Sequence, residues 1–220
     1  GKKGGKPLDE KRRGELSTIQ LGARFKRATA LMDEKKYEDA AKLFIQAVDD
    51  DPKVEFADKA LNNAAFCYQQ AFRFESAIKL YERLFTQYPQ SPLADTSVFL
   101  VGFSAEKAFD FDKAIDRYEL LVDKYVQSPK RADALFNLAH ALERLQRYSE
   151  AQKAYVHYAQ TFPDKEDAPA MLFTGALVAE RTKNWKQEIA DLTDYVRRFK
   201  RNEKEKERIV LAYLKIGLAF

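Results

Sequence analysis

The chain has 220 residues, 45% of them apolar and 33% charged, and a formal net charge of +4, which is typical of a soluble helical protein. The positive charge lies at the ends: residues 1–14 and 197–208 each carry +4, while residues 15–196 carry −5. A general nucleic-acid binder would carry a basic face along its whole length, so nucleic acid is not expected as the main partner.

Compartment and membrane signals are sparse. The single cysteine, Cys67, excludes an intramolecular disulfide and does not identify the redox compartment. The chain contains no run of eighteen apolar residues, so the sequence predicts no membrane-spanning segment. No signal peptide is visible, and because the first residue is Gly1, we expect a processed or partial sequence from which any targeting segment would be missing.

A pattern that repeats every 37 residues organises the chain. An aromatic residue opens each copy, a small residue follows three positions later, and a large apolar residue follows four after that. The aromatic positions are Tyr37, Phe74, Phe111, Tyr148 and Trp185; the small ones are Ala40, Ala77, Ala114 and Ala151, with Glu188 breaking the rule; the apolar ones are Phe44, Tyr81, Tyr118, Tyr155 and Leu192. A fixed period in this range indicates a stacked array of helical units.

Each unit is expected to hold two helices, named here helix A and helix B. In the second unit, apolar spacings of three and four predict helix A over residues 59–70 and helix B over residues 74–87. The short turn between them forces antiparallel neighbours. Small residues recur where the two helices cross, and on helix A they are Ala28, Ala65, Gly102, Ala139 and Ala176.

The pattern of aromatic, alanine, aromatic and boundary proline resembles the tetratricopeptide repeat, whose period is about 34 residues. The resemblance implies an all-α, right-handed α-solenoid of antiparallel helix pairs, with five repeats and one extra helix. The three additional residues per unit follow the boundary proline, so we expect a longer start to helix A. The expected segments are a disordered basic tail at 1–14, repeats at 21–57, 58–94, 95–131, 132–168 and 169–205, and an extra helix at 206–220, within a solenoid of 15–220.

The two ends of the array carry further expectations. The first helix is expected to begin near Leu16 or Ser17 and to run to about Glu34. At the other end, residues 206–220 read as a helix A whose apolar face has no helix B to cover it. We expect either that the parent chain continues or that this face docks on a partner or on a second copy.

The boundary sequence narrows the resemblance. The residues from Tyr88 to Ala94 read YPQSPLA, and a related sequence recurs from Tyr125 to Ala132. Such boundaries resemble tetratricopeptide proteins of Gram-negative envelopes, of the outer-membrane assembly lipoprotein and Tol-Pal coordinator type. This resemblance implies a periplasmic or outer-membrane-associated scaffold, with a cytoplasmic location as the alternative.

No enzyme motif is present, and neither a cofactor nor a metal is expected. The two histidines, His140 and His157, are too few for a zinc site, and the sequence has no phosphate loop and no nucleophile elbow. Cys67 is expected to be inert and partly buried. Trp185 stands at the aromatic position of the repeat, so we expect it to belong to the core.

The expected binding surface lies on the A helices, which line the concave groove of such arrays. The candidate partner-binding residues are Phe25, Asn62, Phe66, Gln69, Phe99, Phe103, Phe136, His140 and Phe173. The alternative is that these rings are buried between adjacent A helices. Phe25 and Thr29 stand where the carboxylate-clamp form of the repeat has lysine and asparagine, which favours a ligand with apolar anchors.

The sequence therefore predicts a non-catalytic protein–protein interaction scaffold within a multiprotein assembly, without a small-molecule substrate. One alternative is a self-assembling module that uses the apolar face of residues 209–220. Another is tethering to anionic membrane or nucleic acid through the basic residues 1–14, a weak and salt-sensitive contact.

Overall fold

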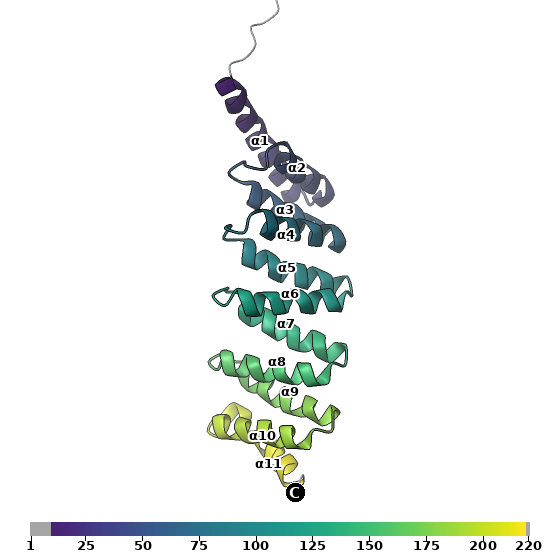
Figure 1. The fold of residues 1–220 in the computed structure, drawn as a ribbon, viewed down its shortest axis with the longest axis vertical. Helices are drawn as coiled ribbons and strands as arrows, with labels where there is room; N and C mark the ends of the chain where they lie inside the picture. Colours follow the sequence, from purple (N-terminus) through teal and green to yellow (C-terminus); the bar gives the residue numbers. More distant parts are fainter. Residues whose placement is uncertain (1–9, 219–220) are drawn as a thin grey trace, which may run out of the picture. The chain divides into compact units, whose positions relative to one another are not determined.

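The computed structural model describes residues 10–218, with side chains described from Thr18 onward (Figure 1). Over these residues the chain forms eleven α-helices and one short 3₁₀ helix, and contains no strand. The predicted fold class is confirmed: the protein is an all-α array of sequential antiparallel helices, about five pairs and one further helix. The chain divides into two compact units, one ending at Ala108 and the other starting at Phe109.

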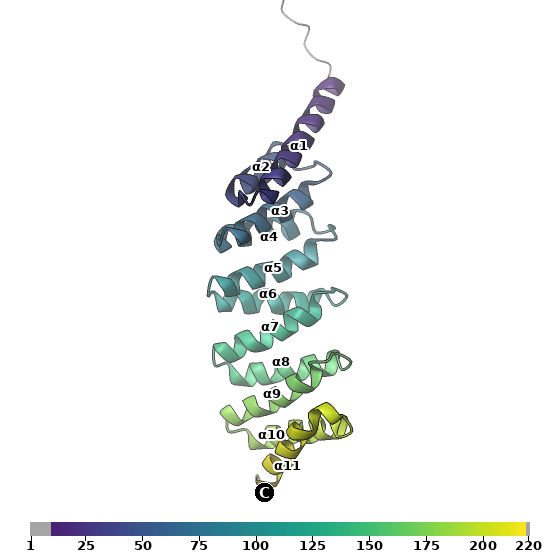
Figure 2. The same ribbon diagram turned by 180° about the vertical axis from the view of Figure 1, so that it is seen from behind.

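Consecutive helices pack against each other within each unit, as both views show (Figures 1 and 2). The first unit contains α1 (Glu10–Asp33), α2 (Tyr37–Asp50), α3 (Ala57–Gln70), α4 (Phe74–Gln87) and α5 (Ala94–Lys107). The second contains α6 (Phe111–Lys124), α7 (Arg131–Arg144), α8 (Tyr148–Thr161), α9 (Ala168–Arg181), α10 (Trp185–Phe199), η1 (Glu203–Glu205) and α11 (Lys206–Leu218). Odd-numbered helices are helix A of their repeat, and even-numbered helices are helix B.

The core forms where the sequence pattern places it. The large residue of each helix B is fully buried, and so is the alanine of each repeat that has one; the large residues are Phe44, Tyr81, Tyr118, Tyr155 and Leu192. Small residues on the facing helix A, such as Ala65 and Ala139, are also fully buried, which lets the helix axes approach closely. Repeated contacts of this kind supply the apolar burial that holds helices A and B together within each unit.

The turn from helix A to helix B ends each A helix with a residue of positive φ: Lys35, Phe72, Phe109, Gln146 and Lys183. At Phe72 the geometry is a Schellman motif, because the Arg73 amide donates to the Tyr68 carbonyl at 2.8 Å and the Phe72 amide to Gln69 at 3.0 Å. A phenylalanine at φ 58° is strained, since its Cβ crowds the carbonyl. Its ring is 81% exposed and meets Phe74 edge-on at 6.1 Å.

Replacing Phe72 by glycine is therefore expected to stabilise the protein. Relief of the left-handed strain outweighs the loss of one exposed ring contact, so the free energy of unfolding should rise by about 0.5–1 kcal/mol. Urea denaturation followed by circular dichroism measures the change. Ala71→Gly is the matched control, because Ala71 has φ −84° and should lose stability. A loss of stability in Phe72→Gly as large as in this control would show that strain is not the dominant effect.

The three extra residues of the 37-residue period lie in the turn from helix B to helix A, and the expectation of a longer helix A was wrong. The helices α3, α5, α7 and α9 each have 14 residues. The turn after α2 instead uses two consecutive three-residue closures, in which Val54 donates to Asp51 and Ala57 donates to Val54. Pro52 supplies the local reason, since proline cannot continue helix B and its ring favours a turn.

The first helix begins earlier than the sequence suggested. Helix α1 starts at Glu10, so residues 10–14, assigned to the basic tail, are helical. Glutamate, lysine and arginine are good helix formers, and no proline follows Pro7 in this stretch. Residues 1–9, the rest of the expected tail, lie outside the described residues.

The final helix, α11, has fewer buried residues than the A helices α3, α5, α7 and α9. Only Ile209 and Ala212 are buried among its described side chains. Polar contacts add to them: the Tyr195 hydroxyl donates to Glu205 Oε2 at 2.6 Å, and Arg208 pairs with the same carboxylate at 2.9 Å. The end of the second unit is thus held both by the packing of Ile209 and Ala212 in the apolar core and by these polar pairs.

Candidate partner-binding surface

The predicted binding residues fall on A helices in both units, and each unit is described by itself. In the first unit they are Phe25 on α1, Asn62, Phe66 and Gln69 on α3, and Phe99 and Phe103 on α5; in the second they are Phe136 and His140 on α7 and Phe173 on α9. Their exposure differs widely, so the set is not a uniform ladder of rings.

Three of the phenylalanines take part in core packing. Phe25 packs edge-on between Phe44 and Phe56, with ring centroids 5.0 and 4.9 Å away. Phe99 is only 9% exposed, and Phe173 is buried with its centroid 5.2 Å from Tyr195. Substituting Phe99 or Phe173 would therefore damage folding before it reported on binding.

Phe66 is the exposed member of the set in the first unit. Its side chain is 40% exposed, and Asn62, one turn earlier on α3, is half-buried. On α5 the register-equivalent Phe103 is half-buried, stacks on Phe99 at 6.4 Å and has the Lys107 ammonium 5.1 Å from its centroid. Apolar rings beside an amide and a cation form a mixed surface suited to a protein segment.

Gln69 does not present a free amide to a ligand. Its Nε2 donates to Ser104 Oγ at 2.9 Å, and its Oε1 accepts from the Tyr81 hydroxyl at 3.0 Å. The residue therefore ties α3 to α5 and to α4. The bond to Ser104 holds α3 beside α5 in the first unit. Phe66 and Phe103 therefore lie on neighbouring helices.

In the second unit, His140 is exposed and lies 4.5 Å from the ring centroid of Phe136. The hydroxyl of the buried Tyr155 donates its proton to Glu143 Oε2 at 2.5 Å and therefore accepts from His140 Nδ1 at 2.9 Å. Burial, followed by the bond to Glu143, raises the pKa of Tyr155. This network fixes the orientation of the imidazole and leaves its ring face beside Phe136.

Cys67 is buried more deeply than the partly buried position expected from the sequence. It is fully buried on α3, and burial raises the pKa of its thiol to about 11. A raised thiol pKa disfavours the thiolate, which is the nucleophilic form.

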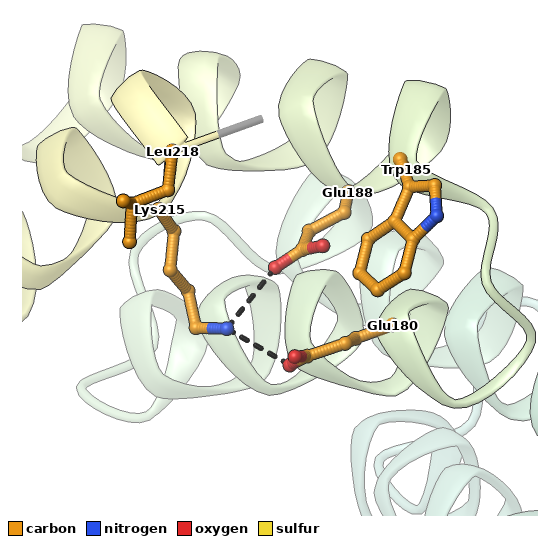
Figure 3. Close-up of a pocket in the computed structure, with 5 residues that line it drawn as sticks. All are labelled: Glu180, Trp185, Glu188, Lys215 and Leu218. Carbon is orange, nitrogen blue, oxygen red and sulfur yellow. Dashed lines mark hydrogen bonds and ion pairs between the residues drawn. The ribbon is translucent and has the colours of Figure 1, made fainter. Parts of the chain in front are cut away.

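Trp185 departs from the expectation, because it is 49% exposed rather than part of the core. It lines a cavity of about 410 Å³ together with Glu180, Glu188, Lys215 and Leu218 (Figure 3). One signal of this site is visible in the sequence: Glu188 stands where the other repeats have alanine. Glu188 is only 5% exposed, and its partner on α11 was not identified from the sequence.

Lys215 is held between two carboxylates in this cavity (Figure 3). Its Nζ lies 2.8 Å from Glu180 Oε2 and 3.3 Å from Glu188 Oε1. Partial burial opposes the charged form, but the bonds to Glu180 and Glu188 outweigh it and raise the pKa of Lys215. The group therefore remains an ammonium at neutral pH, and the lining carries a net charge of −1.

Within residues 10–218, no helix has the combination of length and apolar character needed to cross a membrane.

These features define an α-helical repeat protein with exposed aromatic side chains on its A helices. Family models for the tetratricopeptide repeat match residues 31–96 and 104–166, together more than half of the chain. The chain therefore belongs to the tetratricopeptide repeat family. Members of this family are generally scaffolds for protein–protein interaction and typically non-catalytic.

Solved structures of the same fold resemble this chain at low sequence identity. A tetratricopeptide repeat protein from Parabacteroides merdae is 14% identical, with a TM-score of 0.58, covering 92% of this chain and 74% of that one. The MamA protein is also 14% identical, with a TM-score of 0.60, covering 87% and 96%. The C-terminal part of a repeat protein from Cytophaga hutchinsonii is 16% identical, with a TM-score of 0.54, covering 89% and 69%. At these identities the likeness shows the fold alone.

A search of curated proteins finds no match to this sequence.

Proposed function

We propose that this protein is a non-catalytic scaffold that binds an apolar-anchored segment of another protein on the exposed face of its A helices. Family membership supports an interaction role. The observation that carries the proposal is the exposure of Phe66, a large apolar side chain that the fold leaves 40% accessible beside Asn62. Exposed apolar side chains that gather on one face mark interaction sites.

The surface favours a particular kind of ligand. Phe66 and Phe103 offer apolar contacts, while Asn62, whose nearest described bond is a long 3.5 Å contact to Asn63, offers an amide to a peptide backbone. An amphipathic helix or an extended segment with apolar anchors fits this combination. Phe25 and Thr29 stand where a carboxylate clamp has lysine and asparagine. A ligand that binds mainly through its C-terminal carboxylate is therefore disfavoured.

A peptide selected on the whole protein tests the proposal. Peptides enriched from a random display library are measured by fluorescence anisotropy against the wild type and against Phe66→Ser. Loss of the exposed ring is expected to weaken binding by about 10-fold or more, as for a central interface residue. Enriched peptides should carry aromatic or aliphatic anchors at spacings of three and four.

The matched control is Phe72→Ser, which removes an even more exposed phenylalanine from the turn that follows the same helix. This variant should bind the selected peptide as tightly as the wild type. Both proteins must retain their helical circular dichroism spectrum. Full binding by Phe66→Ser, or an equal loss in the two variants, would overturn the assignment of this face.

The compartment is part of the proposal. The boundary sequence from Tyr88 to Ala94 supports an assembly in a bacterial envelope, periplasmic or associated with the outer membrane, with the cytoplasm as the alternative. Fractionation of the native cells, with periplasmic and cytoplasmic marker proteins as controls, distinguishes the two locations.

Self-association is the second candidate function, and the exposure of α11 favours it. Val210, Tyr213 and Leu214 are each more than half exposed on this helix. Sedimentation velocity over a range of protein concentrations separates a self-assembling chain from a monomeric scaffold. Tethering through the basic residues 1–14 stays a sequence-based expectation, because most of that segment lies outside the described residues.

A further inference from the structure

In the second unit, helix α7 places a cation beside the aromatic residue that opens α6. The guanidinium carbon of Arg144 on α7 lies 5.3 Å from the centroid of Phe111, the aromatic that opens α6. The separation of these two residues is 33 positions, and the same separation joins Trp185 to Leu218. The register position is basic in three of the six A helices, as Lys107, Arg144 and Arg181, and is Asp33, Gln70 and Leu218 in the others.

Among the described residues, Trp185 has leucine, not a cation, at the position that Arg144 takes beside Phe111. Its indole is 49% exposed and forms one wall of the cavity, with Leu218 on the other side (Figure 3). Tryptophan is the aromatic side chain that binds cations most strongly through its ring face. Because Leu218 extends no cationic side chain over the indole, the cavity stays open next to the ring face of Trp185.

The remaining lining has the charge that a cation requires. Glu180 and Glu188 contribute two carboxylates against the single ammonium of Lys215. A carboxylate offers about four acceptor positions, so each retains capacity beyond its one bond to Lys215. Glu188 is almost fully buried, where a negative charge attracts cations more strongly than on an open surface.

We infer that this cavity is a second binding site, which receives an arginine side chain of a partner protein. The planar guanidinium stacks on the Trp185 indole and donates to Glu180 Oε1, the oxygen that does not bond Lys215. Lys215 holds the two carboxylates in place. A guanidinium suits the site better than an ammonium, because it stacks on aromatic faces and donates in two directions. The site adds to the proposed interaction role but rests on residues separate from the Phe66 face.

A titration of the whole protein with a capped tri-arginine peptide tests the inference. Trp185 is the only tryptophan, so its fluorescence reports directly on this cavity. We expect a saturable fluorescence change that weakens with added salt. A tri-citrulline peptide, which has the same shape without the charge, should produce no such change.

Two variants locate the site. Leu218→Arg introduces the residue that α7 has at the equivalent position, Arg144, and should abolish the titration by placing its own guanidinium over Trp185. Glu180→Gln should weaken tri-arginine binding, measured by isothermal titration calorimetry, by about 5-fold or more. Circular dichroism establishes that both variants are folded.

The outcomes separate this site from the proposed function. Phe66→Ser should leave the tri-arginine titration unchanged. The two proposals are therefore tested independently, and failure of one does not contradict the other. Equal binding of tri-citrulline, an unchanged titration in Leu218→Arg, or the absence of saturation would overturn the site. Equally tight binding of a tri-lysine peptide would overturn the guanidinium assignment.

Discussion

Replacing Lys215 with methionine is expected to lower the free energy of unfolding by about 2–3 kcal/mol. Methionine keeps most of the aliphatic packing but removes the ammonium that neutralises Glu188, whose side chain is only 6% exposed. Breaking a fully buried ion pair costs about 3–5 kcal/mol, and the partial exposure of Lys215 reduces that figure. Urea denaturation monitored by Trp185 fluorescence measures the loss next to the affected pair.

The double variant Glu188→Ala with Lys215→Met separates the causes. Alanine is the residue of the other repeats at this position, as in Ala114 and Ala151, so the pair becomes an ordinary small-and-apolar contact. Its stability should return to that of the wild type or exceed it, because replacing a buried ion pair by apolar residues is often neutral or favourable. A double variant as unstable as Lys215→Met would show that the loss comes from the contacts of the lysine itself.

Gly175→Ala is expected to destabilise the second unit by about 1–2 kcal/mol. A Cβ at Gly175 would lie 2.9 Å from Tyr155 Cβ and 3.4 Å from the Gln152 carbonyl oxygen. Tyr155 cannot move aside, since it is fully buried and its hydroxyl bonds Glu143 and His140. Overpacking of this kind costs about 1–3 kcal/mol and exceeds the gain of about 1 kcal/mol in helix propensity.

Gly217→Ala is the matched control, because it is also a helical glycine of the second unit. Apart from its chain neighbours and the backbone of its own helix, no atom of the described residues lies within 4 Å of the position that its Cβ would occupy. This variant should be neutral or gain up to about 1 kcal/mol through helix propensity. The two midpoints of urea denaturation should move in opposite directions or differ clearly; equal shifts would mean that the contact with Tyr155 is not the cause.

Much of the fold could be predicted from the sequence, because its determinants are local and repeat five times. Apolar spacing, short turns and boundary prolines specify helices such as α4, whose observed bounds Phe74–Gln87 equal the predicted ones. The failures also have local causes. The extra residues before α3 lie in the turn, where two consecutive hydrogen-bonded turns accommodate them without altering the helix packing.

The candidate sites were less predictable, because exposure depends on which helix lies opposite. Phe66 and Phe99 are the same residue type on the same helix of successive repeats, one turn apart in register, yet one is 40% and the other 9% exposed. The amide of Gln69 looked free in the sequence and is bonded to α4 and α5 in the fold. Neither outcome follows from spacing along one helix.

The sequence by itself determined the all-α array, the pairing of helices A and B and the alanine and tyrosine contacts of the core, since each follows from a period shared by five copies. Only the tertiary structure decided which aromatic side chains remain accessible. It also brought Lys215 of α11 to Glu188, the one acidic residue in the alanine position, and left Trp185 half-exposed in the same cavity. The physical reason is that accessibility and ion pairing depend on neighbours distant along the chain, whereas helix formation depends on residues within a few positions.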